Sequence, residues 1–311
     1  MVVGVIKKII ISIPSARDNS SSFYVLWNKL FLLELSQDDI YVIQFEFGSC
    51  NFIGANTTAL IGSFISYFVE NFKGFVRIET NTMNRQVHMK LRNMELLSAL
   101  DRKDGFGFHS KNQEVIPYRE FTSGSQEKEV IDYLESDWLS KKRLIFSKEV
   151  KSSVLSSIWE IFANAFEHSN SKSVHCCGTY DDKEKKLSLL VGDTGVGIVS
   201  SVSNFRSGQF TSMDALAWAL VRGNSTYTSN IKLVGAAQPR GLGLHLLTQL
   251  VDVNGGSLEI YTDNVFYKRE YKQDTYLDAP FEVFGSWVRL TLNCNKNTAY
   301  YFKDEEVPIY F

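Results

Sequence analysis

The sequence predicts an α+β protein made of two domains. At 311 residues the chain exceeds the ~250–300 residues at which a single hydrophobic core stops growing. Hydrophobic residues make up 44%, with 22 Phe, 14 Tyr and 5 Trp to fill two cores, and only 5 Pro argue against long extended linkers. Segments with strand and helix periodicity follow one another along the chain. We expect one domain at residues 1–105, a linker and connecting helix at 106–147, and a second domain at 148–311.

The charge of the chain is nearly balanced. With 33 basic and 35 acidic residues the net charge is −2, so no overall basic field draws the protein to nucleic acid or to anionic lipid. No apolar run reaches the ~20 residues of a membrane span. The apolar start of the chain is interrupted by Lys7 and Lys8 and is too short for a secretory signal. We therefore expect a soluble, cytoplasmic protein with no nucleic-acid and no membrane partner.

The four cysteines show no pattern of a metal site. Cys50, Cys176, Cys177 and Cys294 contain no C-x-x-C pair and no Cys/His spacing typical of a metal site. His175 beside Cys176 permits a metal-site interpretation, but residues 174–179 have the pattern of a strand, in which buried free thiols are common. The sequence therefore favours reduced cysteines packed in a strand.

The front of the chain alternates between strands and helices. Periodicity predicts strands at 5–13, 41–47 and 75–80, and helices at 23–33, 57–72 and 87–100. The clearest helix is 57–72, where apolar residues recur at helical spacing, namely Leu60, Ile61, Phe64, Ile65 and Phe68. This alternation predicts a small parallel or mixed α/β sheet.

Residues 42–100 are similar in pattern to a STAS domain, the fold of anti-sigma-factor antagonists. They contain a strand, a loop at Phe52-Ile53-Gly54, a helix, a strand and a terminal helix. In regulatory STAS domains a phosphorylatable Ser or Thr begins the helix after the loop, and Thr57 and Thr58 lie near that place. Because Ser and Thr often cap helices, we expect these two residues to cap the helix and do not predict a phosphorylation site.

The connecting region is polar and punctuated by glycine. Residues 101–124 contain Gly105 and Gly107 among several Lys, Arg and Asp residues, which is typical of a hinge or an inter-domain connection. Helices are predicted at 127–138 and 148–168, flanking the basic run 141–143.

The end of the helix predicted at 148–168 carries a polar pair. Glu160 and Asn164 are four residues apart and share one helix face, while Ile158, Phe162 and Phe166 point elsewhere into a core. An amide oxygen is a hard ligand for Mg²⁺, and a carboxylate can orient or deprotonate a nucleophile beside a phosphate. One face of this helix is therefore predicted to carry ligand-binding or catalytic side chains, and another face is predicted to pack into the core.

Two glycine motifs follow downstream. Asp193-Thr194-Gly195-Val196-Gly197 comes directly after the apolar run 187–191, which predicts a buried strand. Arg240-Gly241-Leu242-Gly243-Leu244 opens an amphipathic helix at 242–253, so its backbone N–H groups can approach phosphates at a helix N-terminus. A helix at 212–222 and strands at 258–262 and 287–292 are expected to complete a mixed sheet.

In this order and at these separations, the three motifs resemble the N, G1 and G2 boxes of the GHKL ATPases over residues 148–293. The resemblance implies a two-layer α/β sandwich of the Bergerat type that binds ATP and Mg²⁺. It implies that Glu160 is the general base where hydrolysis occurs and that Asn164 binds Mg²⁺. Asp193 would accept a hydrogen bond from the adenine amino group, and Gly195 and Gly197 would permit the tight turn beneath the base and ribose.

The resemblance also implies a phosphate-binding turn and a mobile lid. Gly241 and Gly243, with the backbone around Leu242 and Leu244, would cradle the phosphates, and Arg240 opens this ATP-binding motif. In the family the interval 223–240 is the ATP lid. A basic residue there can reach the γ-phosphate, which makes Lys232 and Arg222 candidates, and each can equally be a surface cation.

Three functions follow from these features. The first is an Mg-ATP-binding ATPase or switch that reports its nucleotide state to the STAS-like half or to a protein partner, which includes self-association. The second is a serine/threonine kinase of the anti-sigma type that phosphorylates a STAS-type partner. The third is an interaction scaffold in which the nucleotide is bound but not hydrolysed.

Overall fold

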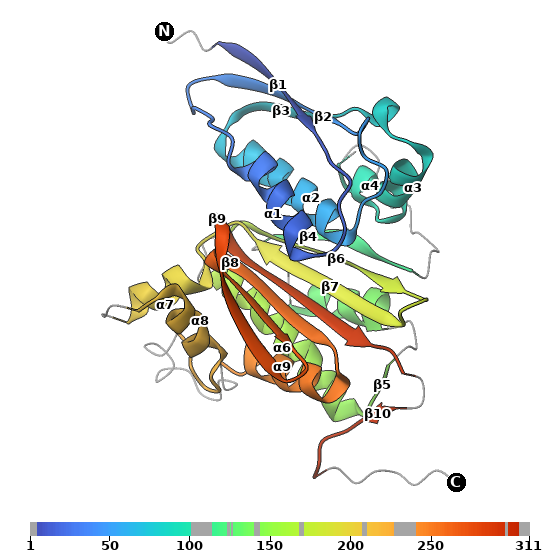
Figure 1. Cartoon of the computed structure of the whole chain (residues 1–311), viewed down its shortest axis with the longest axis vertical. Helices are drawn as coiled ribbons and strands as arrows, with labels where there is room; N and C mark the ends of the chain where they lie inside the picture. The colour runs from blue at the N-terminus through green and yellow to red at the C-terminus, as the bar shows by residue number, and fades with distance from the viewer. Residues whose placement is uncertain are drawn as a thin grey trace.

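The protein is a mixed α/β structure built in four layers (Figure 1). The layers are a three-stranded sheet, a layer of N-terminal helices, a five-stranded sheet and a second layer of helices. The computed structural model describes residues 5–100, 114–122, 125, 127–139, 144–167, 171–206, 210–226, 241–295 and 298–304.

The three-stranded sheet is parallel, as the alternation of the sequence predicts. Its order is β1 (Ile6–Ser12), β2 (Ile40–Glu46), β3 (Lys73–Ile78), and both pairings are parallel. The helices that connect these strands are α1 (Ser20–Phe31) and α2 (Ala55–Asn71). They bury a continuous set of aromatic side chains that includes Phe23, Trp27, Phe31, Phe64 and Phe68.

The helix predicted at 87–100 is two helices. After the short turn η1 (Thr80–Thr82), α3 (Arg85–Asn93) ends before Glu95, and α4 (Leu96–Leu100) follows it. Glu95 has a left-handed backbone, with φ of 61°, which an uninterrupted helix does not permit. Its carboxylate accepts a bond of 2.8 Å from Arg119 Nη1, so a tertiary ion pair accompanies the break.

The prediction that Thr57 or Thr58 caps α2 is wrong. The helix begins at Ala55, and the carboxylate of Asp18 accepts hydrogen bonds from Ala55 N at 3.1 Å and Asn56 N at 2.8 Å. The cap therefore comes from a loop that is distant in the sequence. Thr57 and Thr58 are buried in the first turns of the helix, with exposed fractions of 1% and 0%.

The five-stranded sheet has the order β4-β6-β7-β9-β8. Its strands are β4 (Val115–Thr122), β6 (Ser173–Asp181), β7 (Lys186–Asp193), β8 (Ser257–Glu270) and β9 (Gln273–Asn293). All of its pairings are antiparallel, so the prediction of a mixed sheet is wrong. β8 and β9 form one long hairpin, because Tyr271 and Lys272 both have positive φ and make the tight turn between them.

The edge strand β4 comes from the segment that the sequence assigns to the connection. It pairs with β6 and carries Pro117, which has no N–H to donate and is therefore suited to an edge strand. Next come α5 (Glu127–Tyr133) and the π-helical turn η2 (Leu134–Trp138), within the span predicted as a single helix. The structure thus places 115–122 in the rear sheet.

The second helix layer covers the far face of the five-stranded sheet. It contains α6 (Lys148–Glu167) and α9 (Gly243–Asn254), which pack against each other, with α7 (Ile198–Phe205) and α8 (Ser212–Leu220) beside them (Figure 1). The short strands β5 (Ile145–Phe146) and β10 (Ala299–Tyr300) pair with each other. In the described ranges, no helix combines the length and the apolar character needed to cross a bilayer.

The five-stranded sheet is buried on both faces. On β9, Val288, Leu290 and Leu292 belong to the core beneath α6 and α9, whereas Trp287 belongs to the aromatic core of the N-terminal helices. The four cysteines are buried and free, and for Cys176 and Cys177 of β6 this confirms the prediction of buried free thiols in a strand. Adjacent Cys176 and Cys177 fall in different cores, because successive residues of a strand point to opposite faces.

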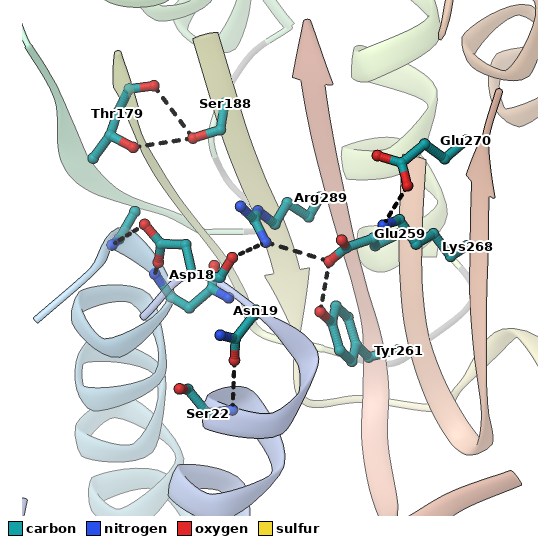
Figure 2. Close-up of polar contacts among 12 residues, drawn as sticks. Asp18, Asn19, Ser22, Thr179, Ser188, Glu259, Tyr261, Lys268, Glu270 and Arg289 are labelled. Atoms are coloured by element: carbon teal, nitrogen blue, oxygen red, sulfur yellow. Dashed lines mark hydrogen bonds and ion pairs between the residues drawn. The ribbon is translucent and has the colours of Figure 1, made fainter. Parts of the chain in front are cut away.

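A polar junction ties the N-terminal layers to this sheet (Figure 2). Arg289 of β9 donates from Nη1 to the backbone oxygen of Asp18, and the same nitrogen lies 3.4 Å from Glu259 Oε2. Tyr261 Oη donates to that carboxylate oxygen at 2.7 Å. Because Asp18 also holds the first turn of α2, one short loop connects the N-terminal helices to the strands of the rear sheet.

Candidate functional site

The polar pair on α6 lies at one pocket. Ile158 and Phe162 are buried in the core with exposed fractions of 1% and 0%, as the predicted structural face of this helix requires. Glu160 is half-buried and Asn164 is exposed, and both line the pocket.

Asp193 reaches the same pocket from the end of β7. It is 4% exposed, and its carboxylate accepts hydrogen bonds from Gly195 N at 2.8 Å and Ser286 N at 3.3 Å. Gly285 lies against this turn with φ of +69°, and a Cβ at that position would come within 2.2 Å of Asp193 O. Two turns from distant parts of the chain therefore hold the Asp193 carboxylate in a fixed orientation.

The second glycine motif meets α6 directly. Glu160 Oε1 accepts a hydrogen bond of 2.8 Å from Gly241 N, and Oε2 accepts one of 2.7 Å from Gly243 N. Gly243 is the first residue of α9, and a Cβ there would come within 2.9 Å of Glu160 Oε2 and of Ser157 O. Gly241 has φ of +77°, a conformation that favours glycine. Glycine at both positions thus permits the close contact between α6 and the start of α9.

The other residues of the glycine motifs surround this contact. Gly241 and Leu244 line the pocket, and Leu242 is the residue that precedes the first turn of α9. Gly197 precedes α7, where a Cβ would come within 2.1 Å of Asp263 Oδ2. The structure therefore brings Glu160, Asn164 and Asp193 together with Gly241 and Leu244 at one place.

The remaining predicted residues lie apart from this group. Arg240 and Lys232 fall outside the described residues. Arg222 is exposed and does not line the pocket.

The sequence did not predict the elements that complete the pocket. α7 supplies Ile198 and Val202 to its apolar wall, and Trp218 of α8 and Val288 of β9 add to it. The start of α7 is held by β8: Ile198 N donates to Thr262 Oγ1 at 2.9 Å, and Val199 N donates to Asp263 Oδ2 at 3.0 Å. These partners are 64 residues apart, so the side chains that hold the start of α7 cannot be found from the local sequence.

The described part of the pocket is acidic. Glu160 and Asp193 are the two charged residues among the described lining residues, which include no Lys or Arg. The carboxamide of Asn164 is an oxygen donor of the kind that Mg²⁺ accepts. In the described ranges, no group of three His, Cys, Asp or Glu side chains is placed to hold a metal by itself. A divalent cation here would need further oxygen ligands, such as those of a phosphate.

No protein-family model matches the sequence, and no curated protein matches it. The functional assignment therefore depends on the residues of the pocket and on the resemblance of the three motifs.

Proposed function

We propose that this chain is an Mg-ATP-binding protein of the GHKL type. We also propose a STAS-like front half and a Bergerat-type rear half, with the nucleotide between α6, the end of β7 and the start of α9. One observation carries this proposal: Glu160, Asn164, Asp193, Gly241 and Leu244 line a single pocket, although they come from three separate sequence motifs. The wall of that pocket is apolar, as a nucleobase requires.

The Asp193 carboxylate supports an adenine site. Its side chain lines the pocket, and the backbone N–H groups of Gly195 and Ser286 donate to its oxygens and so orient the carboxylate as an acceptor of N–H donors. The adenine amino group is a donor of this kind. Ile198, Val202 and Trp218 would then contact the faces of the base.

The start of α9 supports a phosphate site. Gly241 and Gly243 direct their N–H groups at an anion, which is here the Glu160 carboxylate, and the N-terminus of a helix favours negative charge. Asn164 would hold Mg²⁺, which would neutralise part of the phosphate charge when bound. Lys232 and Arg240 remain candidates for further phosphate contacts.

We propose that the protein works as an ATPase-type switch. In the hydrolytic step, Glu160 would accept a proton from a water molecule whose oxygen attacks the γ-phosphorus. The bond between that phosphorus and the bridging oxygen breaks, and ADP and phosphate leave. The packing of α1 and α2 on the opposite face of the same sheet, with the Arg289 junction, offers a route to the STAS-like half.

A scaffold that binds nucleotide without hydrolysis is the second candidate. It is favoured by the hydrogen bonds of Glu160, whose two carboxylate oxygens are both engaged by backbone N–H groups. An anti-sigma-type kinase that phosphorylates a hydroxyl on a partner protein is the alternative, and Thr57 and Thr58 of this chain are buried and therefore not accessible as acceptors.

A calorimetric titration with Mg-ATP tests the proposal. We expect binding by the wild type, and a loss of affinity of about tenfold or more in Asp193→Asn, because hydrogen bonds to charged groups contribute ~1.5–3 kcal/mol. The matched control is Asp181→Asn. Asp181 also accepts two backbone N–H groups, from Lys183 and Glu184, but at the opposite end of the sheet, and this variant should bind normally.

Two results of this titration contradict the proposal. The first is the absence of any Mg-ATP binding by the wild type, and the second is equal affinity in Asp193→Asn and the wild type. Phosphate release by the same samples separates the two candidates, since the switch predicts turnover and the scaffold predicts binding without it.

A further inference from the structure

The Glu160 carboxylate occupies the phosphate side of the proposed site. Its two oxygens accept hydrogen bonds of 2.8 and 2.7 Å from Gly241 N and Gly243 N, a short two-pronged contact. Gly243 is the first residue of the 12-residue helix α9, so the carboxylate lies at the positive end of the helix dipole. The chain thus already carries an anion of its own at this anion-binding turn.

The turn is built independently of that carboxylate. Gly223 N donates to Gly241 O at 2.9 Å, and Leu246 N donates to Leu242 O at 2.8 Å. The first bond orients the peptide group between Gly241 and Leu242, and the second orients the peptide group between Leu242 and Gly243, which carries the N–H of Gly243. The Gly243 N–H therefore keeps its direction when Glu160 moves away, and it remains available to another anion.

A phosphate and the carboxylate cannot use these N–H groups together. Each N–H makes one strong hydrogen bond, and two negative charges within about 4 Å repel each other in a partly buried site. A bound phosphate must therefore replace the Glu160 carboxylate.

We infer that Glu160 is an internal competitor that nucleotide phosphates displace from the start of α9. This inference rests on the proposed function. It makes Glu160 a residue that sets affinity for the phosphate chain and leaves affinity for adenosine unchanged. It also links binding to chemistry, because the carboxylate loses its two N–H partners, and so becomes able to accept a proton, when a phosphate has taken its place.

Binding measurements on Glu160 variants test this exchange. Mg-ATP, Mg-ADP and adenosine are titrated into the wild type, Glu160→Ala and Glu160→Gln. We expect Glu160→Ala to bind Mg-ATP about tenfold more tightly than the wild type, or tighter still, because no carboxylate has to be displaced. Adenosine affinity should change less than about twofold. Glu160→Gln replaces the alanine variant if that variant does not fold, and its affinity for Mg-ATP should also be higher than that of the wild type.

Two controls separate displacement of the Glu160 carboxylate by phosphate from a general loss of negative charge. Glu149→Ala removes a carboxylate from the exposed first turn of the same helix and should leave all affinities within about twofold. Backbone hydrogen exchange at Gly241 and Gly243 provides the second. Without nucleotide, exchange should be about tenfold faster in Glu160→Ala than in the wild type, and Mg-ATP should restore protection in the variant.

The outcomes distinguish the inference from the function on which it rests. The inference is overturned if Glu160→Ala binds Mg-ATP no more tightly than the wild type while adenosine still binds both. It is also overturned if amide exchange at Gly241 and Gly243 is the same in the wild type and in Glu160→Ala before nucleotide is added. If the wild type binds neither adenosine nor Mg-ATP, the proposed function itself fails.

Discussion

The two faces of the five-stranded sheet are filled by different kinds of side chain, although the same strands supply both. Towards α1 and α2 the sheet presents large aromatic residues, and Phe23 stacks on Tyr261 with ring centroids 4.1 Å apart. Towards α6 and α9 it presents mainly aliphatic residues, such as Leu189 and Val288. The aromatic face is closed by interlocking rings, and the aliphatic face has the pocket at its edge.

This difference predicts that the sheet separates stability on one face from ligand binding on the other. Large rings bury much area each and have strongly preferred relative orientations, so they resist repacking. Helix ends and glycine turns cannot fill space in that way, because they leave backbone groups that need polar partners. The pocket lies where such ends converge, at the start of α9, the start of α7 and the end of β7. We expect mutations on the two faces to affect different properties.

Neighbouring residues of β9 give the sharpest test of this separation. Trp287 is fully buried on the aromatic face, and Val288 lines the pocket on the other. We expect Trp287→Ala to lower the free energy of unfolding by about 3–5 kcal/mol, because the substitution leaves a large cavity. The folded fraction should keep its Mg-ATP affinity. Urea unfolding followed by circular dichroism, with calorimetry on the native protein, measures both quantities.

Val288→Ala is the matched variant on the opposite face. It should lower the free energy of unfolding by only about 1–2 kcal/mol, since two methylene equivalents are lost, and it should weaken Mg-ATP binding. The two faces are not separate if Trp287→Ala abolishes nucleotide binding in folded protein. The same conclusion follows if Val288→Ala leaves nucleotide binding intact.

The aromatic face also contains a buried histidine that makes stability depend on pH. His175 is 1% exposed, and its Nδ1 shares a hydrogen bond of 2.8 Å with Tyr118 Oη. Burial lowers the pKa of His175 from 6.5 to about 4, and the nearby Glu120 opposes this effect. The folded protein therefore holds this imidazole neutral between these two values, whereas the unfolded chain binds a proton there.

Because the unfolded chain binds more protons in this window, stability falls as the pH falls from 6.5 towards 4. A displacement of this size corresponds to about 3 kcal/mol over the whole window, at ~1.4 kcal/mol per pKa unit. Urea unfolding at several pH values should show that the free energy of unfolding of the wild type falls by about this amount relative to that of His175→Gln, which has no titrating group at position 175. If the free energies of unfolding of the two proteins change in parallel between pH 6.5 and 4.5, His175 does not make stability depend on pH.

The sequence predicts those parts of the fold whose signals are local. The helices α2, α6 and α9 have apolar residues at helical spacing and were placed within a few residues of their ends. The strand β4 was missed because Pro117 and its charged neighbours Arg119 and Glu120 obscure the strand pattern, and pairing with β6 is what makes them a strand. β8 and β9 were predicted too short for a similar reason, since charged residues such as Lys268, Arg269 and Glu270 interrupt the apolar pattern of their distal halves, which pair with each other.

The same limit applies to the site. Helix spacing places Glu160 and Asn164 on one face, and glycine chemistry marks the two turns, so these residues are found from the sequence. The hydrogen bonds from Gly241 and Gly243 to Glu160 join residues more than 80 positions apart, at sequence separations of 81 and 83, and only the tertiary structure reveals them. The same is true of Asp263, which lies on a strand and acts on a distant helix.

Asp263 gives the smallest predicted effect and connects the strands to the pocket wall. It has φ of 48°, and its carboxylate accepts hydrogen bonds from Val199 N and Ser200 N at the start of α7. Asn tolerates the left-handed conformation, so Asp263→Asn adds no backbone strain. The substitution removes the negative charge and one of the two acceptor oxygens of the side chain.

We expect Asp263→Asn to lower the free energy of unfolding by about 1 kcal/mol, in the range of lost helix caps. It should also weaken Mg-ATP binding about two- to fivefold, because α7 carries Ile198 and Val202 of the pocket wall. Asp214→Asn is the matched control, since Asp214 lies in the first turn of α8, is exposed and does not line the pocket. If both variants change nucleotide affinity equally, the position of α7 does not govern the site, and the separation between a stabilising face and a binding face must be drawn elsewhere.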